Sequence, residues 1–306
     1  MTNTKKGIYL ALATALVSGV AVFLSKFATA AVGDSNVFTT AKNIVVALIL
    51  SLLILTPALW TKLKSLKKGD WIRLAAIGIV GGSIPFLLFF KGLSMSGSVN
   101  SAFIHKTLFI WVMLLAIPFL KEKFSRIQLA AFGLLVVGNF LLVGIKSWSF
   151  GSADLMILGA TLLWAVEYII AKKVLVRIES KIVAWSRMFF GSIILIGFVL
   201  FIGKGAALVS MNTTQWAWIG LISVFLLGYV LTWYEALKLL PASIVTSVLV
   251  IASPITTLLN TIFVQHKFSL NQVFGSLIIA VSVGLIYYGF VKFQAQEKLE
   301  QVALKN

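Results

Sequence analysis

The stretch KFSRIQLAAFGLLVVGNFLL at residues 123–142 recurs as KFSLNQVFGSLIIAVSVGLI at residues 267–286. Lys-Phe-Ser opens both copies, and Gln128 aligns with Gln272 without a gap. A second pair, ALVSGVAVFLSKF at 15–27 and TLLWAVEYIIAKK at 161–173, shows weaker similarity in the same order. A repeat of this length indicates that the fold consists of two related halves.

The composition assigns these halves to a membrane. Of 306 residues, 60% are hydrophobic and 11% are charged, and the mean hydropathy is +1.03. A soluble domain of this size could not cover its surface with so few polar residues. The net charge of +17 therefore reflects basic loops of a membrane protein, and we expect no nucleic-acid partner. The absence of cysteine excludes disulfides and thiolate metal sites.

Apolar runs long enough to cross about 30 Å of hydrocarbon predict ten helical spans. They lie near residues 7–25, 37–57, 74–93, 101–119, 127–145, 153–171, 182–202, 215–237, 243–264 and 272–291. Only helices satisfy every backbone polar group within such a run. Five spans per half is an odd number, so the second half enters from the opposite side. We predict an all-α integral membrane fold with ten transmembrane helices as two inverted five-helix repeats, residues 1–147 and 148–306, the second ending in a short cytoplasmic tail.

Basic residues predict the orientation of this bundle. With the N-terminus inside, the outer loops carry only Lys26, Lys146, Lys204 and Lys267, and nearly all the other loop lysines and arginines face the cytoplasm. The positive-inside rule then places both termini in the cytoplasm. We predict a multi-pass protein of the cell inner (plasma) membrane, in contact with the lipid bilayer. Residues 1–32 also resemble a leader with a cleavage site, but their counterpart in mid-chain favours a permanent first span.

The run LKEKFSRIQLAAFGLLVVGNFLL, residues 120–142, resembles the drug/metabolite transporter superfamily, specifically its EamA-like bacterial members. These often carry Leu-x-Glu, then five residues and Gln-x-x-Gly, in each half. The residues that fit are Glu122, Gln128, Gln272 and Gly275. Ala131 and His266 depart from the pattern. The resemblance covers residues 7–290 and implies ten spans around a central cavity, with members that export amino acids, import metabolites or carry sugar phosphates.

Other departures fall on helices that line the cavity in the family. Ser18-Gly19 stands where many members have Trp-Gly, although Trp164 occupies the equivalent place in the second half. Pro254 fits the proline usual in the ninth span, whereas its first-half counterpart is Ile110. Because of these differences, the identity of the substrate cannot be inferred from that of a relative.

Enzyme motifs are absent from the sequence. It contains no G-x-S-x-G elbow, H-E-x-x-H motif or P-loop, and its two histidines are not grouped with carboxylates at metal-ligand spacing. We therefore expect no catalytic residues, no metal and no cofactor. The spacing Gly78-x-x-x-Gly82 predicts close helix packing.

The candidate functional residues are ionisable groups within the spans, since an intramembrane charge is costly unless it is paired or faces a polar cavity. They are Lys42, Lys91, His105, Lys106, Glu167, Arg187 and Glu235. Lys91 lies near the outer end of its span, where it either snorkels to the interface or binds substrate. Lys42 and Arg187 occupy matched positions in spans two and seven, and we interpret them as mainly structural.

The ninth span carries a polar stripe of Thr246, Ser253 and Thr257, a pattern that favours a cavity over lipid. In the fourth span the equivalent face includes Lys106 and Phe109, so both become candidate substrate contacts. His105 is rotated by about 100° from Lys106 on the helix. We expect it either to contact a neighbouring helix or to take part in proton coupling.

In the sixth span Trp164, Glu167, Tyr168 and Ala171 share one helical face, which makes the first three candidate substrate contacts. Glu167 is either the counter-charge or proton carrier of a coupled transporter, or a member of a structural ion pair. Glu235, near the inner end of the eighth span, is either a gating residue or merely interfacial.

These patterns favour a secondary-active transporter of a small polar metabolite, working by alternating access. The excess of intramembrane cations over acids indicates a carboxylate, most simply an amino acid, and the resemblance favours export. The alternatives are import or exchange of an anionic or phosphorylated metabolite, or a lipid-handling or structural membrane subunit. The expected partners are a small-molecule substrate and a proton or another coupling ion. The sequence favours no oligomeric state.

The predicted orientation can be checked by fusing reporter domains to each terminus. A reporter that functions only in the cytoplasm should be active at both ends, because the basic loops keep both ends inside. Activity at one end alone would contradict the even number of spans.

Overall fold

The computed structural model describes residues 3–96, 99–144, 150–267 and 269–303. All ten predicted spans form helices in this part of the chain. The first half contains α1 (Asn3–Val32), α2 (Ser35–Ile54), α4 (Lys68–Gly82) with α5 (Ile84–Ser96), α6 (Val99–Lys106) with α7 (Leu108–Leu120), and α8 (Arg126–Val143). The predicted boundary between the halves, at 147/148, lies outside the described residues, as do Lys146 and the predicted end of the fifth span.

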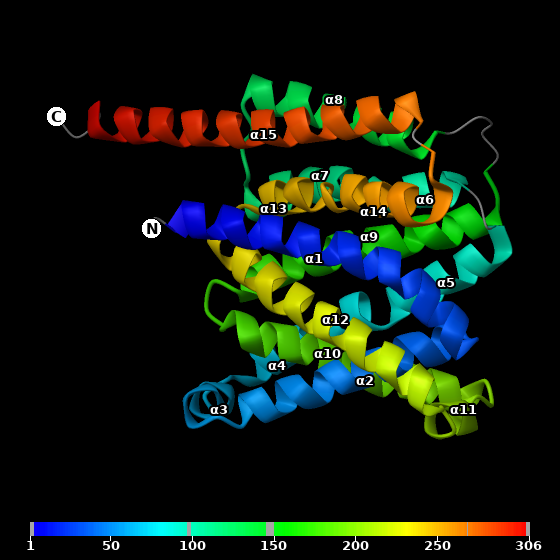
Figure 1. Cartoon of the computed structure of the whole chain (residues 1–306). Coiled ribbons are helices and arrows are strands. Elements are labelled where there is room, and N and C mark those ends of the chain that lie inside the picture. The colour runs from blue at the N-terminus through cyan, green and yellow to red at the C-terminus, as the bar shows by residue number, and fades with distance from the viewer. Residues whose placement is uncertain (1–2, 97–98, 145–149, 268, 304–306) are drawn as a thin grey trace.

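The second half repeats this order with more continuous helices. It contains α9 (Ser152–Val174), α10 (Ser180–Phe201), α12 (Thr213–Leu239), α13 (Ala242–Leu249) with α14 (Ala252–Asn260) and the π-helical segment η1 (Thr261–Gln265), and α15 (Leu270–Ala303). Short helices α3 (Pro57–Lys64) and α11 (Gly205–Val209) lie between spans. At 34 residues, α15 is roughly 50 Å long and extends beyond the predicted tenth span. Both termini lie on one side of the bundle, here called the termini side (Figure 1).

The contacts between helices follow the two-fold relationship that the repeat predicts. Span two packs on its own counterpart, span seven, through α2 and α10, and span five packs on span ten through α8 and α15. The other contacts occur in related pairs: α1 packs against α12 as α9 packs against α5, and α1 packs against α14 as α9 packs against α7. Figure 1 shows α8 and α15 as a pair along one edge and α9 in the interior.

Three of the ten spans are broken, and the breaks have identifiable causes. The third span breaks at Ser83, where Pro85 supplies no backbone N–H. The ninth span breaks at Val250 and Ile251. Pro254 removes the usual donor to the Val250 carbonyl, which accepts instead from the backbone N–H of Ser253 at 2.9 Å.

The fourth span breaks at Thr107, the place related by the repeat to the break in the ninth. No proline causes this break. The Thr107 carbonyl accepts from the backbone N–H of Ile110 at 2.8 Å, and its hydroxyl donates to the Ile104 carbonyl at 2.7 Å. Discontinuous helices at equivalent places in two repeats are typical of substrate sites in secondary transporters.

The Gly78–Gly82 spacing serves close packing, as predicted. A Cβ on Gly82 would lie 2.3 Å from the Arg187 carbonyl oxygen, and one on Gly78 would lie 2.4 Å from Cβ of Phe190. The backbones of α4 and α10 approach each other because neither glycine carries a side chain. This contact holds the third span against the seventh next to the break at Ser83.

Substitution of Gly82 tests this packing. Gly82→Ala should destabilise the fold by about 1–3 kcal/mol, because the added methyl overlaps the α10 backbone. The measurement is thermal unfolding in detergent. Gly284→Ala is the control, since nothing lies within 4 Å of a Cβ at that position; equal losses for the two variants would contradict the assigned contact.

Candidate functional site

The inner face of α9 forms the centre of the molecule. Trp164, Glu167, Tyr168 and Ala171 are all buried, with at most 5% of any of these residues exposed. α9 packs against α4 and α5, against α6 and α7 of the broken fourth span, and against α12 and α13. The face predicted from the sequence therefore touches both halves.

An aromatic cluster lies where α9 meets the broken third and fourth spans. The rings of Phe86 and Phe89 lie 5.3 and 5.7 Å from Trp164, measured between centroids. We call Phe86, Phe89 and Trp164 the aromatic wall. The His105 ring lies 4.9 Å from Phe89 and 5.0 Å from Trp164. His105 thus contacts two neighbouring helices, and its buried Nδ1 has no hydrogen-bond partner in the described part of the chain.

Lys106 is the last residue of α6 and lies directly before the break at Thr107. Its side chain is half-buried, and within the described residues no carboxylate forms an ion pair with it. The half-buried position leaves the ammonium group able to meet a solute. Lys106 is therefore a cation next to His105 in the chain, without a carboxylate counter-ion in the described part of the protein.

The break corrects one step of the sequence argument. Lys106 and Phe109 were placed on one face of a continuous fourth span, but they belong to different helices, α6 and α7. Phe109 is buried and stacks on Phe132 of α8 with 6.4 Å between ring centroids. Phe109 therefore contributes to the core packing between α7 and α8.

The polar stripe of the ninth span is divided in the same way. Thr246 lies in α13, is buried, and donates to the carbonyls of Ala242 and Ser243 in its own helix. Ser253 and Thr257 lie beyond the break in α14, where they are half-buried, and their side-chain hydroxyls form no hydrogen bond with another described residue. These two hydroxyls remain the members of the stripe able to meet a solute.

Two further candidates, Lys91 and Tyr168, differ in their surroundings. Lys91 has an exposed side chain, which fits the snorkelling alternative. Tyr168 faces α12: its hydroxyl lies 3.4 Å from that of Tyr229, and its ring lies 4.5 Å from Trp233. Tyr168 thus contributes to the contact between α9 and α12 next to Glu167.

Glu167 and Arg187 form a buried charge centre. It adjoins the aromatic wall through Trp164 and the Gly81 backbone. Glu167 is fully buried, and its Oε1 accepts a hydrogen bond of 2.7 Å from the Tyr234 hydroxyl. Its Oε2 lies 4.0 Å from Nη1 of Arg187. Nη2 of Arg187 donates to the Gly81 carbonyl at 3.2 Å, and the Trp164 indole donates to the same oxygen at 3.1 Å.

Arg187 and Lys42 are more central than the sequence argument placed them. The Lys42 ammonium lies 5.8 Å from the centroid of the Phe86 ring, so this lysine touches the aromatic wall from α2. It lies close enough to Arg187 to be repelled by its charge. The repeat had paired these two positions, and that pairing was the signal that could have identified them.

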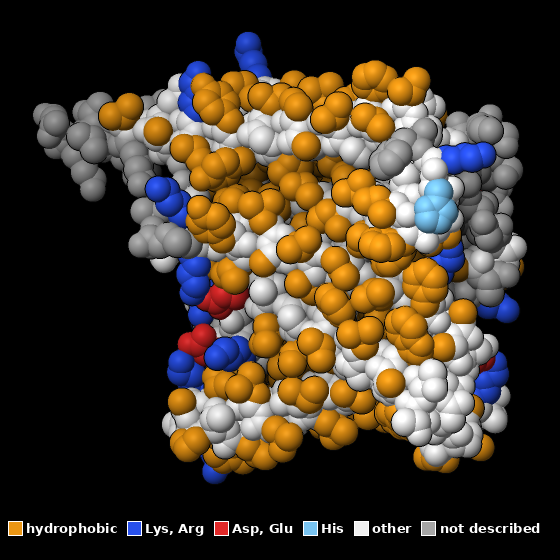
Figure 2. Space-filling model, in the orientation of Figure 1, with side chains coloured by type: hydrophobic (Ala, Val, Ile, Leu, Met, Phe, Trp, Pro, Cys, Tyr) orange, Lys and Arg blue, Asp and Glu red, His pale blue; other side chains and the backbone are white. Residues whose placement is uncertain are grey.

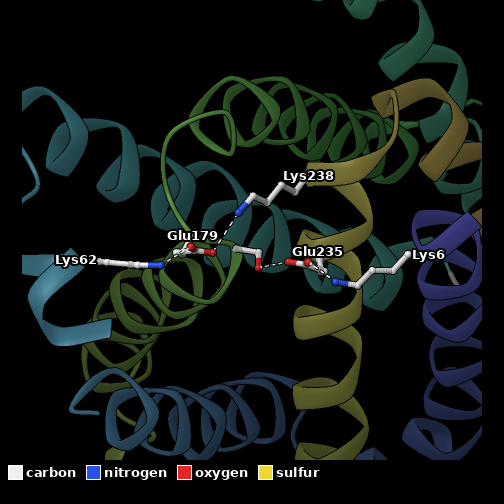
Figure 3. A network of polar contacts seen from close by, with 6 residues as sticks. Lys6, Lys62, Glu179, Glu235 and Lys238 are labelled. Carbon is white, nitrogen blue, oxygen red and sulfur yellow. Dashed lines mark hydrogen bonds and ion pairs between the residues drawn. The ribbon is translucent and has the colours of Figure 1, made fainter. Parts of the chain in front are cut away.

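The termini side of the bundle is closed by polar contacts between the two halves (Figure 3). Glu235 accepts from Lys6 at 3.1 Å and from the Ser180 hydroxyl at 2.6 Å. Glu179 accepts from Lys62 at 2.6 Å and from Lys238 at 3.1 Å, and these two bonds lower the pKa of its carboxyl group. Glu235 therefore lies in this closing network and not beside the aromatic wall.

Glu122, the family-motif residue, adds another contact between the halves on this side. Its carboxylate accepts from the backbone N–H of Ala242 at 2.7 Å and from the hydroxyl of Ser243, at the start of α13. A carboxylate is favourable there because the first N–H groups of a helix lack partners. A pocket of about 210 Å³ adjoins this contact and is also lined by Phe290 of α15.

Polar contacts also join the two halves on the opposite side. Lys204 pairs with Asp34, and Gln215 donates to the Ala31 carbonyl at 3.1 Å. Burial raises the pKa of Asp34, but the bonds from Lys204 and from the backbone bring it below its usual value. Within the described residues no three His, Cys, Asp or Glu side chains group as metal ligands.

Comparison with known proteins agrees with this architecture. Residues 5–144 and 151–288 each match the EamA-like transporter family, one match for each half. The chain belongs to the EamA-like transporter family.

Among curated relatives, the uncharacterized transporter YyaM of Bacillus subtilis (strain 168) is 25% identical over 297 residues, which cover 94% of this chain and 95% of YyaM. One solved crystal structure aligns with a TM-score of 0.73 at 11% identity, covering 92% of this chain and 96% of its own. That likeness concerns the fold alone. This EamA-like chain is thus a multi-pass transporter.

The closing network should respond to acid. Since hydrogen bonds lower the pKa of Glu179, its contribution to stability is present above the usual glutamate pKa of about 4.3 and is lost as pH falls through the lowered value. Acidification should therefore lower the thermal midpoint of the wild type more than that of Glu179→Gln. The difference should stay below about 1 kcal/mol, because the pairs are partly exposed. Identical pH profiles would contradict the contribution of Glu179.

Proposed function

We propose that the chain is a secondary-active transporter of a small metabolite that carries a carboxylate, most simply an amino acid. The observation that carries this proposal is Lys106, a half-buried cation at a helix break that has no carboxylate partner among the described residues. An ammonium group offers a compact charge and three donors to such an anion. Helix breaks in a membrane also supply unpaired backbone groups that line substrate sites.

The neighbours of Lys106 suit the rest of such a solute. His105 lies against Phe89 and Trp164, so an apolar body could contact the aromatic wall while its carboxylate meets Lys106. Ser253 and Thr257 offer hydroxyls on the equivalent broken span of the second half. A site with elements from both halves fits alternating access, in which each half moves relative to the other.

Export of the solute across the inner (plasma) membrane, with both termini cytoplasmic, is the favoured direction. The family resemblance supports export, and the basic loops support the orientation of the termini. Cations also outnumber acids within the spans, with half-buried Lys42 and Lys106 and buried Arg187 against buried Glu167. This excess also suits an anionic or phosphorylated metabolite that is imported or exchanged. A lipid-handling or structural subunit would use none of these groups as a solute site.

A thermal-shift screen of the purified protein tests the carboxylate assignment. The probes are L-leucine, L-threonine, succinate, glucose 6-phosphate and choline. A carboxylate probe should raise the free energy of unfolding, by about 2.7 kcal/mol at a concentration 100 times its Kd. Lys106→Met should remove this stabilisation, because it deletes the charge and keeps the apolar stem.

Lys64→Met is the matched control, since Lys64 is an exposed lysine on α3, stacked 5.2 Å from Trp60 and remote from the helix breaks. Stabilisation by glucose 6-phosphate alone would favour the phosphorylated alternative. Stabilisation by choline alone, or an undiminished carboxylate effect in Lys106→Met, would overturn the proposal. No response to any probe would favour the lipid-handling or structural alternative.

A further inference from the structure

The charge centre of Glu167 and Arg187 is only partly paired. Structural arginine–carboxylate pairs are commonly bidentate, with nitrogen–oxygen distances of about 2.7–2.9 Å. Here Nη1 and Oε2 lie 4.0 Å apart, and neither atom has a hydrogen-bond partner within the described residues. Full burial of Glu167 makes such an arrangement costly. The pair therefore leaves part of the hydrogen-bonding capacity of both groups unused.

Arg187 is shared between two acceptors. Pro85 carries no N–H, so the Gly81 carbonyl lacks the donor that a continuous helix would supply four residues later. Nη2 of Arg187 and the Trp164 indole supply the missing hydrogen bonds at 3.2 and 3.1 Å. The same guanidinium group therefore faces both the Glu167 carboxylate and the backbone at the break of the third span.

This backbone leads directly to the candidate site. Phe86 and Phe89 follow the break and form the aromatic wall with Trp164, which contacts His105. Gly81 also sits against Glu167, because a Cβ there would lie 2.4 Å from the glutamate Cγ. A shift of Arg187 or of the break would thus reach the wall within one helical turn.

We infer that Glu167 binds the coupling proton and that Arg187 transmits its charge to the Gly81 carbonyl at the break. This inference deepens the proposed transport function and rests on it. A proton from the aqueous phase bonds to Oε2 and cancels the carboxylate charge. Arg187 then loses its anionic partner and binds the Gly81 carbonyl alone; release of the proton on the other side restores the pair.

The surroundings of Glu167 support this role. The titratable and charged groups that face it or its partner are Tyr168 on its own helix, Tyr229 and Tyr234 on α12, Arg187 on α10, Lys42 on α2 and, beyond Trp164, His105 and Lys106 on α6. Within the described residues the other span carboxylate set back from a helix end, Glu235, belongs to the termini-side network. Of these two carboxylates, Glu167 is the one that lies against Gly81, at the break of the third span.

Infrared difference spectroscopy of the protein in lipid nanodiscs tests the first half of this inference, without any metabolite. Acidification should produce the C=O band of a newly protonated buried carboxyl group in the wild type. The band should be lost in Glu167→Gln and kept in Glu235→Gln, the control at the edge of the bundle. A band that persists in Glu167→Gln would overturn the assignment. If that variant does not fold, Glu167→Asp should shift the frequency of the band. An unshifted band would also overturn the assignment.

Hydrogen–deuterium exchange tests the second half. Exchange of the amides around Gly81–Phe86 should change with pH across the infrared transition in the wild type. The quantity compared is the protection factor, which removes the pH dependence of chemical exchange itself. It should stay constant across this pH range in Glu167→Gln, which carries a permanently neutral side chain of the same shape. In Arg187→Lys the carboxyl group should still titrate while exchange at the break no longer follows it, because a single ammonium replaces the planar fork.

Exchange that follows pH equally in the wild type and in Glu167→Gln would overturn the link to the break. These readouts are separate from the metabolite screen. A probe that stabilises through Lys106, with no Glu167 band, would leave the transport proposal standing and reject this inference. A Glu167 band with no stabilising probe would reject the proposed carboxylate substrate and leave the proton site at Glu167 standing.

Discussion

The Gly81 carbonyl is the group on which the interior depends. In hydrocarbon a backbone acceptor without a donor costs several kcal/mol, because no water can replace the missing bond. Pro85 leaves this carbonyl without its helical donor, and Arg187 and Trp164 approach from two other spans to supply it. One missing N–H therefore draws together the third, sixth and seventh spans.

The glycines of α4 make this approach possible. The bare face of Gly78, Gly81 and Gly82 admits the α10 backbone and the Glu167 side chain into space that a methyl group would fill. A carboxylate and a guanidinium can then share a site that neither could occupy alone. Close packing, usually a source of rigidity, here places a charge pair against a backbone break, which is a place where a helix can bend.

The two sides of the bundle differ in how the halves are joined. On the termini side Glu122, Glu179 and Glu235 each receive hydrogen bonds that cross from one half to the other. The opposite side has Asp34–Lys204 and the Gln215 contact within the described residues. Hydrogen bonds and ion pairs at the ends can break and re-form in water at little cost. Pairs of this type would suit the alternating access that we propose, in which such surfaces separate.

Several features could be predicted from the sequence, because they depend on local patterns. The spans follow from the length of apolar runs, the inverted halves from the recurrence of Lys-Phe-Ser with Gln128 and Gln272, and the buried face of Trp164 and Glu167 from helical spacing. Each of these rests on contacts within a helix or on a duplicated order of helices. Packing between distant helices does not alter them.

The tertiary structure decided which of these groups meet. The break at Thr107 could not be predicted from a proline, because none causes it. It separates Lys106 from Phe109, whose ring packs on α8. Lys42 and Arg187 lie in spans that the repeat could pair but could not orient toward Phe86 and Glu167. The sequence by itself determined the ten helices and their inverted duplication, since hydrophobic length and repetition are properties of the chain. Only the tertiary structure decided the charge centre and the aromatic wall, because both depend on side chains from different spans approaching within a few ångströms.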